Sequence, residues 1–505
     1  MLFNTPEFIF LFLPAAVLLH FGLARYSAHA AVIGTTISSL FFYAWWNPPF
    51  LLLLVASIVA NFWLARRIVA APRDGSLALL IAGIVANVLV LGYYKYVDFL
   101  LSIVYGYKAA APNVPLALSF TTFVQIAFLV DVYRRRNSLD FNRYALFVAF
   151  FPHLIAGPIV RLSNLGRQIV DPNRYRLDWS NVALGLTIFT FGLTKKVLIA
   201  DSLSPHVGVV FDAATRGDPV TAFAAWGAAF AFSAQIYFDF SGYSDMAVGL
   251  GLLFNFRLPI NFAAPLRSSN IFDFWRRWHI TLSQFFRDFV YGPLTFGRPA
   301  PLWRATSLII TMMLVGLWHG AGWTFIVWGG YHGVLLLINF GWQTLAASDR
   351  PTRPGRFAGW ALTFTACAVG AVFFRAADIG ASWHLIKAMT GFGDAGIAEH
   401  LALQWDDWMI RHGYLSELFV RTWLGTTWSM VGTFWTIAAL AVALLVPDTM
   451  EIVDYREGEA QSHWRRQVGA LAWRPSHFWV ATIAIIFVAV FTSLGRVTEF
   501  LYYQF

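Results

Sequence analysis

The feature that most constrains this chain is a series of long apolar stretches that recurs along its whole length. A helix of about 20 apolar residues spans a hydrocarbon core of about 30 Å. Only 12% of the 505 residues are charged, whereas ordinary soluble domains have about 25%, so a water-soluble fold could not cover this apolar surface. The sequence therefore predicts an all-α polytopic membrane protein. Spans are expected near residues 6–24, 31–46, 50–65, 77–98, 115–133, 181–200, 221–238, 306–319, 322–345, 358–376, 431–447 and 477–495.

Two shorter apolar pieces, at residues 144–160 and 243–256, are interrupted by proline or glycine. Such interruptions are typical of re-entrant or buried segments that line a cavity, so we expect re-entrant or buried segments here rather than lipid-facing helices. No internal repeat appears, and no basic region precedes the first span, which is read as a retained helix. The prediction is one membrane domain over residues 1–505 with about 11–13 membrane helices.

Arginine clusters in short loops predict the orientation of the chain. Those at 66–73 and 134–143 lie two spans apart, as do those at 350–356 and 456–474. Because basic loops stay in the cytoplasm, both termini and the stretch of about 377–430 are expected on the periplasmic side. The net charge of +9 is thus interpreted as topology signal and contact with membrane lipid, and no nucleic-acid partner is expected.

Polar residues are concentrated in the membrane segment that begins at Gln235. Polar groups in a membrane span are costly and usually functional. One interpretation is a polar kink whose groups satisfy each other between helices, and the other is the wall of a hydrated cavity. The residues concerned are Asp239, Ser241, Tyr243, Ser244 and Asp245.

Aromatic and basic residues alternate over residues 272–288. Their spacing predicts an amphipathic helix at the membrane surface, with Trp facing lipid and Arg facing headgroups. Arg276 and Arg277 could also hold an anionic donor, because guanidinium groups pair well with phosphate. Lipid contact alone accounts for most of these arginines.

His319 lies in an apolar segment beside three glycines, in the text Gly316-Leu-Trp-His-Gly-Ala-Gly-Trp323. A helix from Arg304 would rise about 22 Å and place it deep in the membrane, toward the outer side. A buried imidazole without a carboxylate stays neutral, which is the form a general base needs. His279 is embedded in similar text forty residues earlier. The alternative for each histidine is a structural interhelical hydrogen bond.

At these residues the sequence resembles the membrane-bound O-acyltransferase family, in its bacterial alginate O-acetyltransferase branch. The resemblance covers nearly the whole chain, and the paired Trp-His motifs are specific. The matching text lies at residues 1–8, 151–161, 238–247, 274–283, 316–323 and 500–505.

The resemblance implies a ring of tilted transmembrane helices around a central tunnel that joins a cytoplasmic donor pocket to an external acceptor funnel. It implies His319 and His279 as catalytic residues and acetyl-CoA as donor, without a bound cofactor or metal. The acceptor would be an exported polysaccharide such as alginate, reached across the bacterial inner membrane directly or through a periplasmic acetyltransferase partner. Candidates for substrate or donor binding are Trp318, Trp278, Asp239, Ser241, Tyr243, Ser244, Asp245, Arg276, Arg277 and Asn270.

Several alternatives stay open. After Leu294 the chain lacks the basic loop of many relatives, which puts any donor or partner contact made by that loop in doubt. His153 stands where relatives often have Gln, a difference that would change only a hydrogen bond. Within the family the chain could be a teichoic acid D-alanyl transferase, or acetylate peptidoglycan or cellulose. A proton-coupled transporter or flippase would belong to another class, and the inverted repeats expected of one are not found.

Overall fold

The computed structural model describes residues 1–45, 48–106, 114–298, 300–345, 352–391, 428, 430–455, 468–494 and 501. All regular elements among these residues are helices. The longer helices are α1 (Leu13–Ala24), α2 (Ala28–Ala44), α3 (Pro48–Ala70), α4 (Arg73–Lys95), α6 (Leu118–Arg135), α10 (Trp179–Thr194), α11 (Asp201–Arg216), α12 (Ala222–Leu253), α16 (Pro301–His319), α17 (Trp323–Leu345), α18 (Arg353–Arg375), α19 (Ile379–Met389), α22 (Met430–Leu445) and α24 (His477–Phe491).

Short helices and π-helical turns connect them. The short α-helices are α5 (Val97–Tyr105), α7 (Phe141–Ala149), α8 (Phe151–Leu154), α9 (Arg167–Val170), α13 (Ile271–Arg277), α14 (Ile280–Phe286), α15 (Gly292–Thr295) and α23 (Thr449–Ile452). The π-helical segments are η1 (Phe8–Phe12), η2 (Leu162–Gly166), η4 (Lys195–Ala200) and η6 (Arg287–Tyr291), and the 3-10 turns are η3 (Pro172–Tyr175), η5 (Pro265–Arg267) and η10 (Gly469–Leu471).

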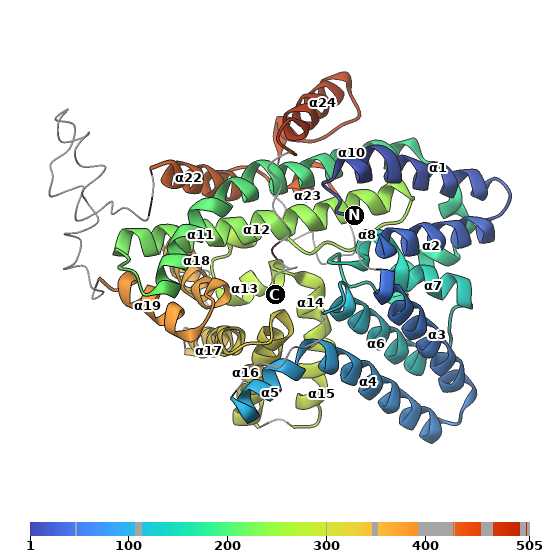
Figure 1. Ribbon diagram of the computed structural model, residues 1–505, viewed down its shortest axis with the longest axis horizontal. Helices are drawn as coiled ribbons and strands as arrows, with labels where there is room; N and C mark the ends of the chain where they lie inside the picture. Colours follow the sequence, from blue (N-terminus) through green and yellow to red (C-terminus); the bar gives the residue numbers. More distant parts are fainter. Residues whose placement is uncertain are drawn as a thin grey trace.

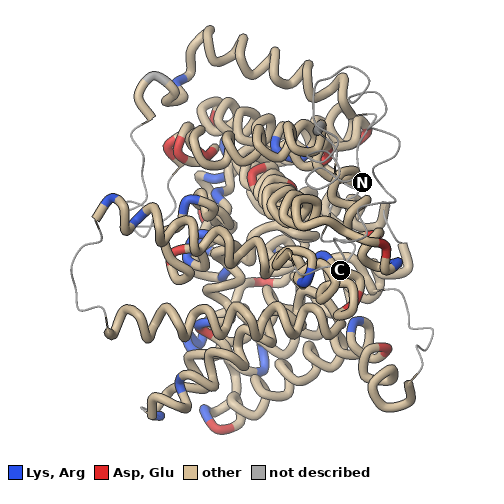
Figure 2. Tube along the Cα trace, turned by 90° about the vertical axis from the view of Figure 1, so that its left-hand side faces the viewer, with Lys and Arg blue, Asp and Glu red and all other residues tan. Residues whose placement is uncertain are grey.

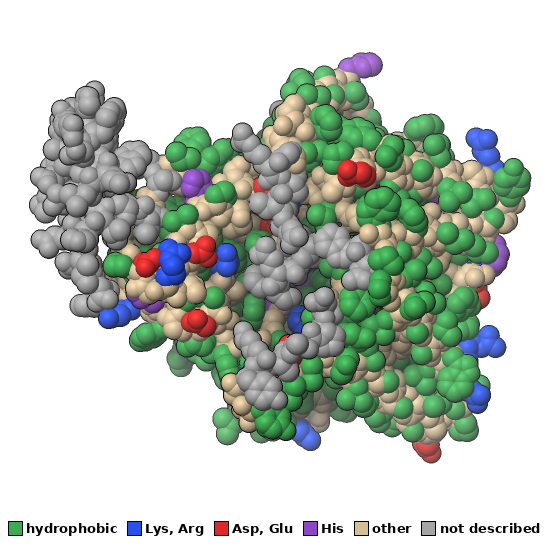
Figure 3. All heavy atoms as spheres, in the orientation of Figure 1, with side chains coloured by type: hydrophobic (Ala, Val, Ile, Leu, Met, Phe, Trp, Pro, Cys, Tyr) green, Lys and Arg blue, Asp and Glu red, His purple; other side chains and the backbone are tan. Residues whose placement is uncertain are grey.

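Among the described residues, seven helices are long and apolar enough to cross a membrane, and three shorter apolar helices accompany them. Their outward faces carry apolar side chains such as Leu18, Leu52 and Leu362, each more than 70% exposed, which are stable against lipid rather than water. Long uncharged stretches of helix (Figure 2) and a mainly hydrophobic face (Figure 3) agree with this. The prediction of an all-α polytopic membrane protein is confirmed, while the exact number of membrane crossings stays a prediction.

The two N-terminal basic loops lie together, as the orientation prediction requires. The Arg136 guanidinium, just after α6, donates hydrogen bonds to the carbonyl oxygens of Ile68, Val69 and Ala71, which end α3. Both loops are therefore on the same side of the molecule. Of the predicted external stretch, residues 377–391, 428 and 430 are described, and the end of the chain at Phe505 lies outside the described residues.

Helix α12 runs through the middle of the described structure, between the N-terminal helices and α16–α19 (Figure 1). The segment at 243–256 is buried, as one of the two expectations has it, but it is not re-entrant, because α12 continues unbroken through it to Leu253. Glycines there serve close packing: a Cβ on Gly192 of α10 would lie 2.5 Å from the Gly242 carbonyl oxygen of α12. Likewise, a Cβ on Gly185 of α10 would lie 2.7 Å from the Gly249 carbonyl oxygen of α12, so these glycines let the two backbones pack directly together.

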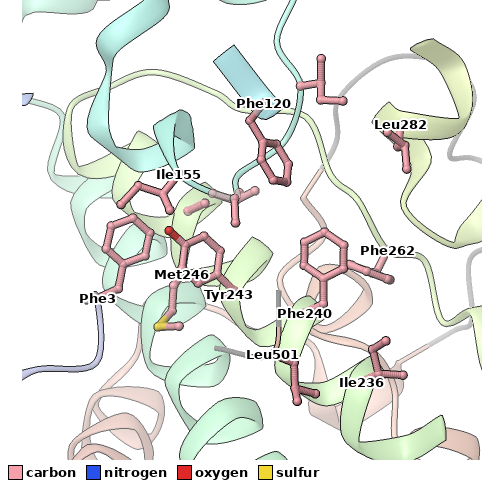
Figure 4. Packing of buried hydrophobic residues seen from close by; sticks show 14 of the residues in the cluster. Phe3, Phe120, Ile155, Ile236, Phe240, Tyr243, Met246, Phe262, Leu282 and Leu501 are labelled. Carbon is pink, nitrogen blue, oxygen red and sulfur yellow. The ribbon is translucent and has the colours of Figure 1, made fainter. Parts of the chain in front are cut away.

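The predicted interruption at 144–160 is present as α7, a break at Phe150, and the four-residue α8. Aromatic rings fill the space between this segment, the N-terminus and α12. Phe3 stacks on Tyr243 at 4.9 Å between ring centroids, and Phe240 meets Phe262 edge-on at 5.1 Å (Figure 4). Large flat rings bury much apolar area with few rotatable bonds, which suits a rigid centre.

Candidate active site

His319 is the last residue of α16 and lies inside the protein, with 3% of its surface exposed. Glycines allow this position. A Cβ on Gly316 would lie 2.0 Å from the Phe325 carbonyl oxygen of α17, and one on Gly329 would lie 2.2 Å from the Met312 carbonyl oxygen. The backbones of α16 and α17 thus pack directly together. The helix stops at Gly320, whose backbone is extended.

His279 lies between α13 and α14 and is fully buried. Its φ of 42° puts it in the left-handed region, which costs a non-glycine residue about 1–2 kcal/mol. Asn261 offsets this strain: its carbonyl accepts from the Ile280 amide at 3.0 Å, and its side chain accepts from the Thr281 hydroxyl at 2.7 Å. The helix predicted over 272–288 is therefore not continuous: α13 and α14 cover most of this range, but the chain breaks between them to turn His279 inward. Trp275 and Trp278 are buried, so the prediction that they face lipid is wrong.

The structure brings the two histidines together, with 6.3 Å between their ring centroids. Aromatic rings surround them: Phe240 lies 4.6 Å from His279, and Trp328 and Phe374 lie 5.3 and 5.1 Å from His319. Such a surround excludes bulk water and strengthens any electrostatic interaction inside it.

Three cavities border this centre. A small one of about 50 Å³ touches His319, His332 and Trp278, and one of about 90 Å³ touches His319, Trp318 and Lys95. A large cavity of about 800 Å³ follows α16 from Leu308 to Val315, one helical turn before His319. The large cavity thus follows the middle of α16, and the 90 Å³ cavity lies at its end, where His319 is part of the wall.

Comparison with known proteins identifies the family. Residues 89–369 match the model of the membrane-bound O-acyltransferase family. The peptidoglycan O-acetyltransferase of Helicobacter pylori is 40% identical over 445 residues, which cover 81% of this chain and 84% of that protein. The chain belongs to the membrane-bound O-acyltransferase family. It is therefore an O-acyltransferase rather than a transporter.

Other similar proteins in this family differ in their named acceptors. A probable alginate O-acetylase, AlgI, of Azotobacter vinelandii is 42% identical over 78% of this chain and 79% of its own length. The teichoic acid D-alanyltransferase of Bacillus subtilis is 28% identical over 44% of this chain and 58% of its own length. The predicted family resemblance is confirmed.

Within this O-acyltransferase, some predicted binding residues border the cavities. Trp278 lines the 50 Å³ cavity, Trp318 lines the 90 Å³ cavity, and Arg276 lines the large one. Arg277 instead pairs with Asp273 at 3.0 Å. The Asn270 side chain accepts a hydrogen bond from the Asp273 amide and begins α13, which is the role of a helix cap.

The five polar residues of α12 line none of these three cavities. Asp239 pairs with Lys196 at 2.7 Å, and Asp245 pairs with Lys195 at 2.8 Å. Ser241, Tyr243 and Ser244 are buried. For the two aspartates the structure favours the interpretation in which polar groups satisfy each other between helices.

Sequence reasoning missed the partners of these groups. Lys195 and Lys196 form η4 and also pair with Asp448 and Asp201, both at 2.7 Å. Lys95 was also missed, although a lysine at the end of an apolar span is a signal: its Nζ donates to the Trp318 and His319 carbonyl oxygens at 2.5 and 3.2 Å.

One carboxylate, that of Asp288, holds an arginine in place on the wall of the large cavity. Arg287, which lines the cavity, and Arg161 both donate to Asp288, at 2.8 and 2.7 Å. Burial raises the pKa of Asp288, but the two guanidinium groups outweigh it and hold the pKa below its usual range. Asp288 therefore stays ionised and fixes Arg287 at neutral pH.

Proposed function

We propose that this chain moves acetyl groups from acetyl-CoA on the cytoplasmic side of the bacterial inner membrane to hydroxyl groups of an exported polysaccharide such as alginate. His319 acts as general base toward the attacking hydroxyl. His279 orients the thioester or relays a proton, and a periplasmic acetyltransferase partner takes over the acetyl group if transfer is relayed. Both termini face the periplasm.

The observation that carries this proposal is the position of His319, on the wall of the 90 Å³ cavity and one helical turn beyond the large cavity. Imidazole is the commonest general base in enzymes and contributes typically 10²–10⁴-fold to rate. At the end of α16 it is within reach of a thioester arriving along the helix from one side and a hydroxyl arriving from the other.

The large cavity fits the donor. Its 800 Å³ falls within the range of about 300–1,000 Å³ that small-molecule sites occupy. Arg276 and Arg287 lie on its wall, and guanidinium groups bind phosphate by paired, charge-assisted hydrogen bonds. Arg304, near the start of α16, is on the side that basic residues assign to the cytoplasm. The nucleotide part of acetyl-CoA would rest against these arginines, with its thioester toward His319.

The identities of the relatives support an acetyl group and a polysaccharide acceptor. Two relatives of about 40% identity are named for O-acetyl transfer, and the D-alanyl transferases match less than half of this chain. D-alanyl transfer is therefore the weaker alternative. Alginate and peptidoglycan remain the two acceptors to separate.

The test is the His319→Ala variant of the full chain, purified and supplied with labelled acetyl-CoA and polysaccharide. Transfer should fall by about 10²–10⁴-fold while the protein still inserts and purifies as the wild type does. His477→Ala is the matched control, because that histidine is exposed at the start of α24. Full activity in His319→Ala would remove this residue from the mechanism.

A further inference from the structure

The 90 Å³ cavity beside His319 contains hydrogen-bond donors of the kind that acyl transfer requires. When a hydroxyl attacks a thioester, the carbonyl oxygen becomes negatively charged in the tetrahedral intermediate. Enzymes stabilise this oxyanion with donors that are fixed in place before the reaction begins. On the proposed function His319 takes the hydroxyl proton, so the donors have to come from other residues near it.

Lys95, the last residue of α4, is held beside His319 in a fixed position. Its Nζ donates to the Trp318 and His319 carbonyl oxygens, at 2.5 and 3.2 Å, where the dipole of α16 is negative. An ammonium group has three N–H donors, so one is left for the cavity that Lys95 lines. In the described part of the chain no carboxylate lies within ion-pair distance of Nζ, so no carboxylate there neutralises its charge.

The Trp318 indole is a second donor in the same wall. It is 4% exposed, and its Nε1–H has no hydrogen-bond acceptor among the residues that the structure describes. The Lys95 Nζ lies 5.8 Å from the centroid of this ring, and the His319 ring centroid lies 4.8 Å from it. The ammonium, the indole and the imidazole thus border the same small space.

The wall contains acceptors as well, namely the His319 imidazole and the Ser119 hydroxyl. Attack by a hydroxyl needs both kinds of group, because one accepts the proton while the others donate to the charge that forms at the same moment. Aromatic rings around His319 exclude bulk water, and an electrostatic interaction is stronger in such a site than in water. This mixed wall therefore suits a transient oxyanion beside a base.

We propose that Lys95 and Trp318 together stabilise the oxyanion of the acyl transfer. The hydroxyl oxygen bonds to the acetyl carbon, its proton passes to His319, and one electron pair of the C=O bond moves to the oxygen. That oxygen accepts hydrogen bonds from the Lys95 Nζ and the Trp318 Nε1–H. When the C=O bond re-forms, the bond to sulfur breaks and the CoA thiolate takes the proton from His319. The inference rests on the proposed function and adds two catalytic residues to it.

The test measures kcat and KM of the purified full chain with acetyl-CoA, and p-nitrophenol release from p-nitrophenyl acetate, a small ester without a nucleotide. Lys95→Met should lower kcat about 10²–10³-fold with either donor. Its KM for acetyl-CoA should not change, because the hydrogen bond to the oxyanion exists only in the transition state. Lys95→Arg keeps the charge and the N–H donors and should restore part of kcat. Trp318→Phe keeps an aromatic ring without the N–H and should lower kcat about tenfold.

Lys387→Met is the matched control, because Lys387 is exposed on α19 and its loss should change neither constant. His319→Ala gives the background rate. Wild-type kcat in Lys95→Met would overturn the proposal, as would a loss that lies in KM alone. If Lys95→Met does not fold, Trp318→Phe decides, and an unchanged kcat there overturns the proposal.

The two donors separate this inference from the proposed function. If p-nitrophenol release depends on both His319 and Lys95 but acetyl-CoA is not used, the proposed function fails and the inference stands. If acetyl-CoA is used and Lys95→Met keeps its kcat, the inference fails and the proposed function stands. If neither donor reacts above the His319→Ala background, both fail.

Discussion

Replacing Lys196 with methionine tests whether the charges inside the membrane domain hold the fold together. The Lys196 Nζ lies 2.7 Å from an oxygen of Asp201 and 2.7 Å from an oxygen of Asp239. The side chains are 4%, 5% and 2% exposed. Lys196→Met leaves two carboxylates buried without this ammonium. Removing one partner of a buried ion pair costs about 3–5 kcal/mol, a large share of the roughly 5–15 kcal/mol that stabilises a typical protein.

The triple variant Lys196→Met, Asp201→Asn, Asp239→Asn provides the internal comparison. It removes all three charges and keeps the side-chain volumes. Its free energy of unfolding should therefore return to within about 1–2 kcal/mol of the wild-type value. Stability is measured as the temperature at which detergent-purified protein loses its monodisperse peak, with Lys387→Met as control. A wild-type melting temperature for Lys196→Met would refute the reasoning. If Lys196→Met is stable but inactive, the group of Lys196, Asp201 and Asp239 serves the reaction rather than the fold, which agrees with the prediction that Asp239 binds substrate or donor.

Two further predictions concern the positioning of the site. Gly316→Ala should lower both stability and acetylation sharply, because its Cβ would meet the Phe325 carbonyl oxygen at 2.0 Å and push apart the helices that position His319. Gly341→Ala, where a Cβ meets nothing within 4 Å, should be tolerated, and equal loss in both variants would contradict this account. Asp288→Asn should destabilise the protein by about 1 kcal/mol at pH 7. Because the pKa of Asp288 is depressed in the folded protein, the difference in stability between this variant and the wild type should stay constant above about pH 5. It should vanish as the pH falls through the folded-state pKa of Asp288, which a series of melting curves checks.

The sequence predicted the membrane helices well because their signal is local. Apolar length alone marks a span, and α3, α4, α16, α17 and α18 all appear close to their expected ranges. The segment at 243–256 failed for an equally physical reason. Its glycines suggested a break, whereas they allow α12 to touch the backbone of α10, and a local pattern does not distinguish these two uses.

For the polar residues, too, the sequence predicted what is local and missed contacts between distant segments. The Trp-His text marked both histidines, and the structure places their ring centroids 6.3 Å apart. Hydropathy does not say whether a buried carboxylate is paired. The partners of Asp239 and Asp245 are Lys196 and Lys195 of η4, and Lys195 also pairs with Asp448, about 200 residues further on. Lys95, at the end of an apolar span, could have been singled out from the sequence, but its contact with His319 could not, because it joins residues 224 positions apart.

The placement of His319 at the end of a helix also explains how an acetyl group could pass a membrane without its carrier. A charged nucleotide is very costly to bring into hydrocarbon, whereas the large cavity follows α16 from Leu308 to Val315. Trp318 and His319 follow one helical turn later, on the wall of the 90 Å³ cavity. On the proposed function, therefore, the donor would stay in the large cavity, and the acetyl group alone would pass to the acceptor where α16 ends.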